Sequence, residues 1–147
     1  EKTAAVRKGS RFFVTAANVS VPVFAVVVRK GYGLGAQAMA GGSLQTPFFC
    51  VSWPTGEFGG MGLEGAVRLG YRKELEAETD PVAQKALYDK LVARQYAVGR
   101  ATSVAGFLEI DAVIDPVETR AWIVRGLKAA GAALKRAGKK RPFIDTW

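Results

Sequence analysis

Hydrophobic positions along the chain alternate between short, nearly continuous runs and longer stretches at helical spacing. The runs at residues 21–29 and 48–53 are rich in valine and phenylalanine, and such runs are typical of strands buried on both faces of an α/β sheet. A shorter run within residues 108–114 predicts a brief strand that ends at Asp115-Pro116. Residues 57–61 predict a short extended piece between the second strand and the next helix.

Other segments carry apolar residues on one side of a helix. The expected helices are 9–19, 36–40, 62–71, 81–98 and 117–137, with a short helical turn at 102–106. The long helix at 81–98 has the clearest start, because Asp80 can cap it and Pro81 suits its first position. Strands that alternate with helices predict an α/β layer architecture.

Glycines at alternate positions follow the first predicted strand, in the series Gly31-Tyr32-Gly33-Leu34-Gly35. Because good helix formers come next, this series predicts a strand, a tight turn and a helix. The unpaired N–H groups at such a helix start can hold a developing negative charge. A glycine-rich turn without any catalytic role explains the same residues, so the turn alone leaves both interpretations open.

A dinucleotide site is the obvious competing interpretation, since Gly31-x-Gly33-x-x-Ala36 has the spacing of that fingerprint. Its second half is missing. The end of the next strand holds Trp53-Pro54 where a ribose-binding acid belongs, and Glu57 comes only after the proline. A phosphate-binding P-loop fails as well, because no Gly-Lys-Ser/Thr follows the turn.

Glu57 and Glu64 flank a second glycine-rich stretch and could form a pair of carboxylates for acid and base catalysis. Glu64, however, falls in the first turn of a predicted helix, where the helix dipole favours an acid. A structural role for both residues is therefore the simpler hypothesis, with catalysis by either one as the alternative.

Composition narrows the possible classes of function. The 147 residues suit one ordinary domain, and the apolar runs are far too short to span a bilayer. No segment has the form of an export signal, so we expect a cytoplasmic or organelle-matrix location. The chain begins with Glu1 rather than methionine, which suggests a part of a longer polypeptide.

The chain has no histidine, which excludes Ser-His-Asp and Cys-His catalysis and any zinc site that needs imidazole. We expect no metal site. The single Cys50 lies in an apolar run and is expected to be a small buried side chain. The net charge is +8. The basic residues are spread along the chain and cluster only near the C-terminus, at Lys135, Arg136, Lys139, Lys140 and Arg141. We interpret that cluster as a solvated helix end rather than a nucleic-acid patch.

Several motifs in order resemble those of one enzyme family. They are Pro22-Val23-x-Ala25-Val26-Val27-Val28-Arg29-Lys30-x-Tyr32-Gly33-x-Gly35-Ala36, Ser52-Trp53-Pro54-Thr55-x-Glu57, Gly60-Met61-Gly62-x-Glu64-Gly65-Ala66-Val67, Tyr71-Arg72-Lys73-Glu74-Leu75 and Ala105-Gly106-Phe107-x-Glu109-Ile110-Asp111-x-Val113-Ile114-Asp115-Pro116-x-Glu118-Thr119-Arg120. Together they resemble the carboxyltransferase (beta) subunit of biotin-dependent acyl-CoA carboxylases, in its C-terminal domain. The likeness covers most of residues 21–127.

The resemblance implies a crotonase-like α/β spiral fold, here as a partial domain with buried strands and flanking helices. Residues 1–147 would be the later part of the C-terminal, biotin-side domain, with the N-terminal domain absent. The family's active site lies between facing domains of different subunits, which implies a homo-oligomer and a biotin carboxylase or biotin carrier partner. Carboxyl would pass from carboxybiotin to a short acyl-CoA, and the isolated fragment would be inactive.

The resemblance also implies specific site residues. Backbone N–H groups of Leu34 and Gly35 would hold the ureido oxygen of biotin, with Gly33 and Ala36 shaping the turn. Many relatives have glycine or alanine at the position of Leu34, and a larger side chain there narrows the approach while leaving the backbone donor intact.

Two other functions remain as alternatives. One is a non-catalytic fragment that keeps only the subunit-interface helices. The other is a biotin-independent hydratase or isomerase of the same broad fold, for which Glu57 and Glu64 would have to act as acid and base.

Overall fold

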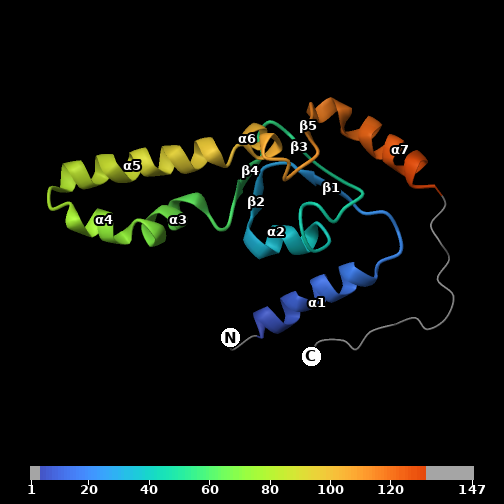
Figure 1. The fold of residues 1–147 in the computed structure, drawn as a ribbon, viewed down its shortest axis with the longest axis horizontal. Helices are drawn as coiled ribbons and strands as arrows, with labels where there is room; N and C mark the ends of the chain where they lie inside the picture. The colour runs from blue at the N-terminus through green and yellow to red at the C-terminus, as the bar shows by residue number, and fades with distance from the viewer. Residues whose placement is uncertain (1–3, 132–147) are drawn as a thin grey trace.

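Parallel pairing joins the strands into two small sheets in the computed structural model, which describes residues 4–131 (Figure 1). Strands β1 (Phe24–Val27), β3 (Phe49–Ser52) and β5 (Ala112–Val113) form the first sheet in the order β1-β3-β5. Strand β2 (Lys30–Tyr32) pairs with β4 (Glu57–Gly59) in the second. Parallel strands connected through helices confirm the predicted α/β architecture.

The helices of the described chain flank these sheets or extend from them. Their bounds are α1 Ala5–Asn18, α2 Gly33–Met39, α3 Leu63–Gly70, α4 Arg72–Ala77, α5 Pro81–Val98, α6 Ala101–Gly106 and α7 Thr119–Ala130, the last preceded by the 3₁₀ turn Pro116–Glu118. Helices α3, α4 and α5 fold back on one another as an arm that projects to the left in Figure 1. Helix α1 lies against α2, and α7 packs on β1 at the other end of the molecule.

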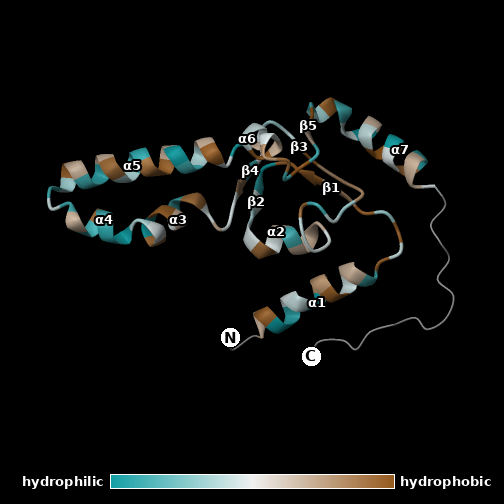
Figure 2. Ribbon diagram, in the orientation of Figure 1, coloured by the Kyte–Doolittle hydropathy of each residue, from teal (hydrophilic) through white to brown (hydrophobic). Residues whose placement is uncertain are grey.

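The core lies on both faces of β3, whose four residues are all buried. Cys50 belongs to one cluster, with Phe58 and Val104, while Phe49 and Val51 belong to a second cluster on the opposite face. Figure 2 shows hydrophobic ribbon at the centre of the molecule, over β1 and β3, and mixed colours along α5. The prediction of a strand buried on both faces is therefore confirmed for Phe49–Ser52, whereas Phe48, at the start of the predicted run, is 51% exposed.

The first predicted strand is shorter and more exposed than expected. Only Phe24–Val27 of the 21–29 run is a strand, and its residues are half-buried. In the described sheet β1 has one neighbour, β3, so it is an edge strand. Pro22 lacks the N–H that would extend the ladder toward the N-terminus.

The observed helices differ from the predicted ones mainly in the residues at which they begin. Helix α1 begins at Ala5 rather than residue 9, and α2 begins at Gly33 rather than residue 36. Strand β2 and helix α4 were not expected as separate elements. The predicted final helix is confirmed as α7 up to Ala130, and its remainder, with the basic cluster, lies outside the described residues.

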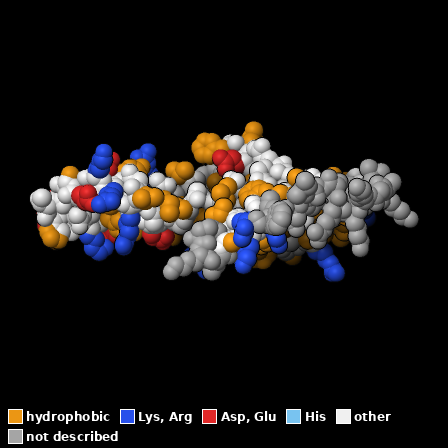
Figure 3. All heavy atoms as spheres, turned by 90° about the horizontal axis from the view of Figure 1, so that it is seen from below, with side chains coloured by type: hydrophobic (Ala, Val, Ile, Leu, Met, Phe, Trp, Pro, Cys, Tyr) orange, Lys and Arg blue, Asp and Glu red, His pale blue; other side chains and the backbone are white. Residues whose placement is uncertain are grey.

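Figure 3 shows the molecule from below, with Lys and Arg side chains on the arm and hydrophobic side chains near the middle. Over residues 4–131, we find no helix with the length and apolar character needed to cross a bilayer.

Candidate functional site

Two strand-to-helix junctions meet at one edge of the smaller sheet. Tyr32 ends β2 and pairs in register with Gly59, which ends β4. Helix α2 begins directly after Tyr32, and α3 begins at Leu63. Because β2 and β4 are parallel, both helices start at the carboxyl ends of the strands, the edge at which α/β proteins bind ligands.

Glycines allow these two junctions to lie against each other. Gly33 has a φ of 60°, and a Cβ placed on it would lie 2.7 Å from the carbonyl oxygen of Gly60. On the β4 side, a Cβ on Gly59 would lie 2.7 Å from Leu63 Cδ2. The close approach of the two junctions therefore requires glycine at position 33, where a side chain would meet backbone, whereas at Gly59 it would meet the end of the Leu63 side chain.

The first turn of α2 presents backbone N–H groups without a capping side chain. Within the described residues, Tyr32 makes no side-chain capping hydrogen bond and the first turn of α2 has no acid. By helix geometry, the amides of Leu34 and Gly35 have no partner four residues earlier. The helix dipole adds partial positive charge there, so this turn favours a negatively charged group.

Helix α3 begins at the same edge and has an acidic residue in its own first turn. Glu64 lies in its first turn and accepts a hydrogen bond of 2.6 Å from Tyr96 Oη. This bond and a backbone hydrogen bond lower the pKa of Glu64. The N-terminal turn of α3 is thus paired with an acid of its own, whereas the described residues place no acid in the first turn of α2.

A cavity of about 310 Å³ lies beside the β2–α2 junction. Of the four predicted site residues, Gly33 and Ala36 line this cavity, and Leu34 and Gly35 are not among its lining residues. Leu34 is 70% exposed, and a Cβ on Gly35 would meet nothing within 4 Å. The structure therefore places the two predicted donors at the surface of the junction.

Polar side chains at this cavity were missed by sequence reasoning. Gln37, Gln95 and Glu109 all line it, together with glycines of β2 and β4. They come from three separate segments of the chain, and no motif or periodicity relates them. Only the folded structure brings them together.

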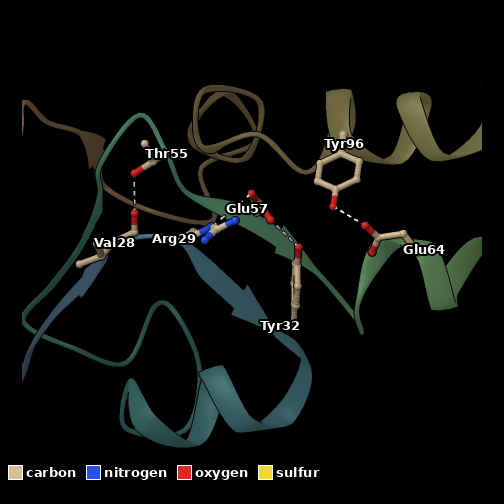
Figure 4. A network of polar contacts seen from close by, with 7 residues as sticks. All are labelled: Val28, Arg29, Tyr32, Thr55, Glu57, Glu64 and Tyr96. Carbon is tan, nitrogen blue, oxygen red and sulfur yellow. Dashed lines mark hydrogen bonds and ion pairs between the residues drawn. The ribbon is translucent and has the colours of Figure 1, made fainter.

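A hydrogen-bonded pair holds the residue that precedes α2 (Figure 4). Tyr32 Oη donates to Glu57 Oε2 at 2.7 Å, and Arg29 Nε lies 3.9 Å from Glu57 Oε1. Burial, and then the hydrogen bond to Glu57, raise the pKa of Tyr32 far above its usual range.

Glu57 and Glu64 are each bound by a different tyrosine. A carboxylate that accepts such a bond is held in one orientation, which suits a structural role for each. The structure thus favours the simpler of the two hypotheses for this pair.

Cys50 is fully buried, as predicted. Burial raises the pKa of its thiol to about 11, with a smaller contribution from Asp111. Over residues 4–131, no three His, Cys, Asp or Glu side chains come together as a metal site would need.

Comparison with known proteins agrees with this fold. The family model described as the carboxyl transferase domain matches residues 1–143. The chain is 34% identical over 123 residues to the methylmalonyl-CoA carboxyltransferase 12S subunit of Propionibacterium freudenreichii subsp. shermanii, covering 84% of this chain and 23% of that protein. It is 32% identical over 142 residues to the propionyl-CoA carboxylase carboxyltransferase subunit of Haloferax mediterranei, covering 97% and 26%.

Solved structures give the same result. A single-chain, multi-domain long-chain acyl-CoA carboxylase superposes with a TM-score of 0.72 at 53% identity, over 86% of this chain and 12% of that one. The hexameric transcarboxylase 12S, solved with methylmalonyl-CoA and methylmalonic acid, superposes with a TM-score of 0.83 at 26% identity, over 99% and 28%.

The chain spans about a quarter of the length of the curated relatives it matches. Within that span, the family match, the parallel strands and the flanking helices all agree. The chain therefore belongs to the carboxyl transferase domain family and has its crotonase-like α/β fold.

Proposed function

We propose that this chain is the later part of the C-terminal, biotin-side domain of a carboxyltransferase subunit. In that subunit, carboxyl would be transferred from carboxybiotin to the α-carbon of a short acyl-CoA. The family match and the relatives named for propionyl-CoA and methylmalonyl-CoA support the reaction class. The observation that carries the proposal is the first turn of α2, where residues 4–131 supply neither a capping side chain nor an acid and which lies at the carboxyl edge of parallel strands.

The residues at this edge fit a urea-type oxygen. Such an oxygen needs N–H donors, and the first-turn amides of Leu34 and Gly35 are donors without intrahelical partners. Gly35 has no side chain, and a Cβ there would meet nothing within 4 Å, so a ligand can approach the backbone closely. Carboxybiotin, when bound, would supply the carboxyl group.

Each residue of the turn has a distinct part in the proposal. Leu34 and Gly35 donate hydrogen bonds to the oxygen as it gains negative charge, and Gly33 and Ala36 shape the turn. Losing one donor of this kind typically lowers kcat by about 10²- to 10³-fold. Backbone donors are already in place before reaction, so they stabilise developing charge without reorganising.

The proposed site needs more than this chain. The chain spans about a quarter of the length of its curated relatives. As the family resemblance implies, the acyl-CoA side would come from a facing domain of another subunit in a homo-oligomer. A biotin carboxylase or biotin carrier would be the partner that delivers carboxybiotin. We place this assembly in the cytoplasm or an organelle matrix.

Carboxyl transfer measured with the longer subunit and with residues 1–147 alone tests the proposal. We expect the longer subunit, supplied with carboxylated biotin, to carboxylate a short acyl-CoA, and the segment alone to show no turnover. Turnover of an enoyl-CoA by the longer subunit in the absence of biotin, with no carboxyl transfer, would instead indicate a hydratase and contradict the proposal.

A further inference from the structure

We propose that Glu57 is a positioning residue, which orients the backbone donors of α2 by holding the Tyr32 side chain that directly precedes them. The inference rests on the proposed function, because it assigns a role in arranging the same turn. It concerns a side chain that lies outside that turn and on the neighbouring strand.

The pairing of β2 with β4 brings Glu57 to Tyr32. Lys30 is directly opposite Glu57, and Tyr32 is opposite Gly59, so the tyrosine reaches diagonally to the residue two positions back on the other strand. A Cβ placed on Gly59 would lie 3.9 Å from Tyr32 Cδ1, an ordinary contact distance, so the tyrosine ring lies beside this glycine.

Glu57 is itself held firmly by its backbone. Its N–H donates to the carbonyl oxygen of Arg29 at 2.6 Å, and its strand also forms an antiparallel bridge to Arg100. Its side chain is 24% exposed, whereas that of Arg29 is 71% exposed, so the ion pair at 3.9 Å adds little. The hydrogen bond from Tyr32 Oη is therefore the contact that matters (Figure 4).

The flexibility of Gly33, the residue after Tyr32, makes the position of the Tyr32 side chain important. Gly33 has no side chain of its own to restrict its backbone, and it carries the turn into α2 with a φ of 60°. Tyr32 on one side and the carbonyl of Gly60 on the other limit the path of the chain through this glycine. A displacement of about 1 Å in a catalytic group can lower the rate by about 100-fold, so a modest change in this path would matter.

Kinetics of three variants of the longer subunit test the role. We expect Tyr32→Phe and Glu57→Ala each to lower kcat for carboxyl transfer by about tenfold or more, with the KM for acyl-CoA changed less than about twofold. Glu57→Gln keeps an oxygen that accepts the hydrogen bond and should recover most of kcat. The double variant Tyr32→Phe/Glu57→Ala should lose no more than either single variant, because both changes remove one interaction.

The pair of Tyr96 and Glu64 provides a matched control. Tyr96→Phe removes a tyrosine–glutamate hydrogen bond of 2.6 Å that joins α5 to α3 and does not involve α2. We expect its kcat to equal that of the unmodified subunit, with folding of all variants checked by circular dichroism at the assay temperature. An equal loss of kcat in Tyr96→Phe, or wild-type kcat in Tyr32→Phe, would overturn the positioning role.

The Gly35→Pro variant separates this inference from the function on which it rests. A large loss of kcat in Gly35→Pro together with wild-type kcat in Tyr32→Phe would reject only the role of Glu57. Wild-type kcat in Gly35→Pro would reject the proposed donor turn, and the positioning role with it.

Discussion

Single residues at the β2–α2 junction determine where the proposed donors lie. Gly33 adopts a left-handed backbone conformation against the carbonyl of Gly60, and Tyr32 is tied to Glu57 on the next strand. The two glycines of the turn differ in what surrounds them. Gly33 is confined by backbone, whereas Gly35 is in open space, and this difference makes them a useful pair for mutation.

Gly33→Ala should destabilise the fold by about 1–3 kcal/mol, because alanine is strained at a φ of 60° and its Cβ would lie 2.7 Å from an oxygen. Gly35→Ala is the control. It adds a methyl group in a helix with nothing within 4 Å, and should change stability by at most about 1 kcal/mol, in the stabilising direction. Urea denaturation measures both, and equal stabilities for the two variants would contradict the described junction.

Cys50 should make stability fall at alkaline pH. Burial raises the pKa of its thiol from the ordinary 9.0 to about 11, so the folded state keeps a proton that the unfolded state loses first. The contribution is therefore fully present below about pH 9 and is lost as pH rises toward 11. The difference in unfolding free energy between wild type and Cys50→Ala should be constant below pH 9 and shrink above it, and a constant difference up to pH 11 would contradict the burial.

Among the elements, α5 follows its sequence signals closely. The Asp80 side chain accepts hydrogen bonds from the N–H groups of Val82 and Ala83, both at 3.2 Å, and Pro81 is the first helical residue. Both features were predicted from two adjacent residues, Asp80 and Pro81, since capping is a local interaction. The helix ends at Val98, as expected.

Asp80→Ala should therefore destabilise the fold by about 1 kcal/mol, through the loss of two capping bonds. Asp89→Ala on the same helix is the matched control. It removes an exposed ion pair with Lys85, which is worth only about 0.3–0.5 kcal/mol. Thermal unfolding of both variants compares them, and a larger loss in Asp89→Ala would show that the cap is not formed.

Elements that depend on distant partners were harder to predict. Strand β2 has three residues and contains a glycine, so no apolar pattern marks it. It forms because it pairs with β4. Gly31 of β2 lies opposite Phe58 of β4, and a Cβ placed on Gly31 would lie 3.3 Å from the Phe58 ring. The glycine turn could be predicted because its residues are adjacent in the sequence. The cavity residues Gln37, Gln95 and Glu109 could not, because only the folded chain brings them together.

The whole molecule leaves large apolar side chains exposed around α1 and α2. Phe12 is 58% exposed and Met39 is 81% exposed, and α1 has no buried residue within the described chain. Apolar surface of this kind usually marks a contact with other protein. We expect it to be covered in the longer subunit, where the proposed site would also be completed by a facing domain.

The turnover of Gly35→Pro in the longer subunit tests whether the backbone N–H of residue 35 holds the biotin-side oxygen. Proline lacks this N–H, which by helix geometry has no partner within the helix. We predict that kcat for carboxyl transfer falls about 10²- to 10³-fold relative to Gly35→Ala, in which the N–H is kept. Equal turnover in the two variants, both folded, would show that the N–H of residue 35 does not stabilise charge on this oxygen.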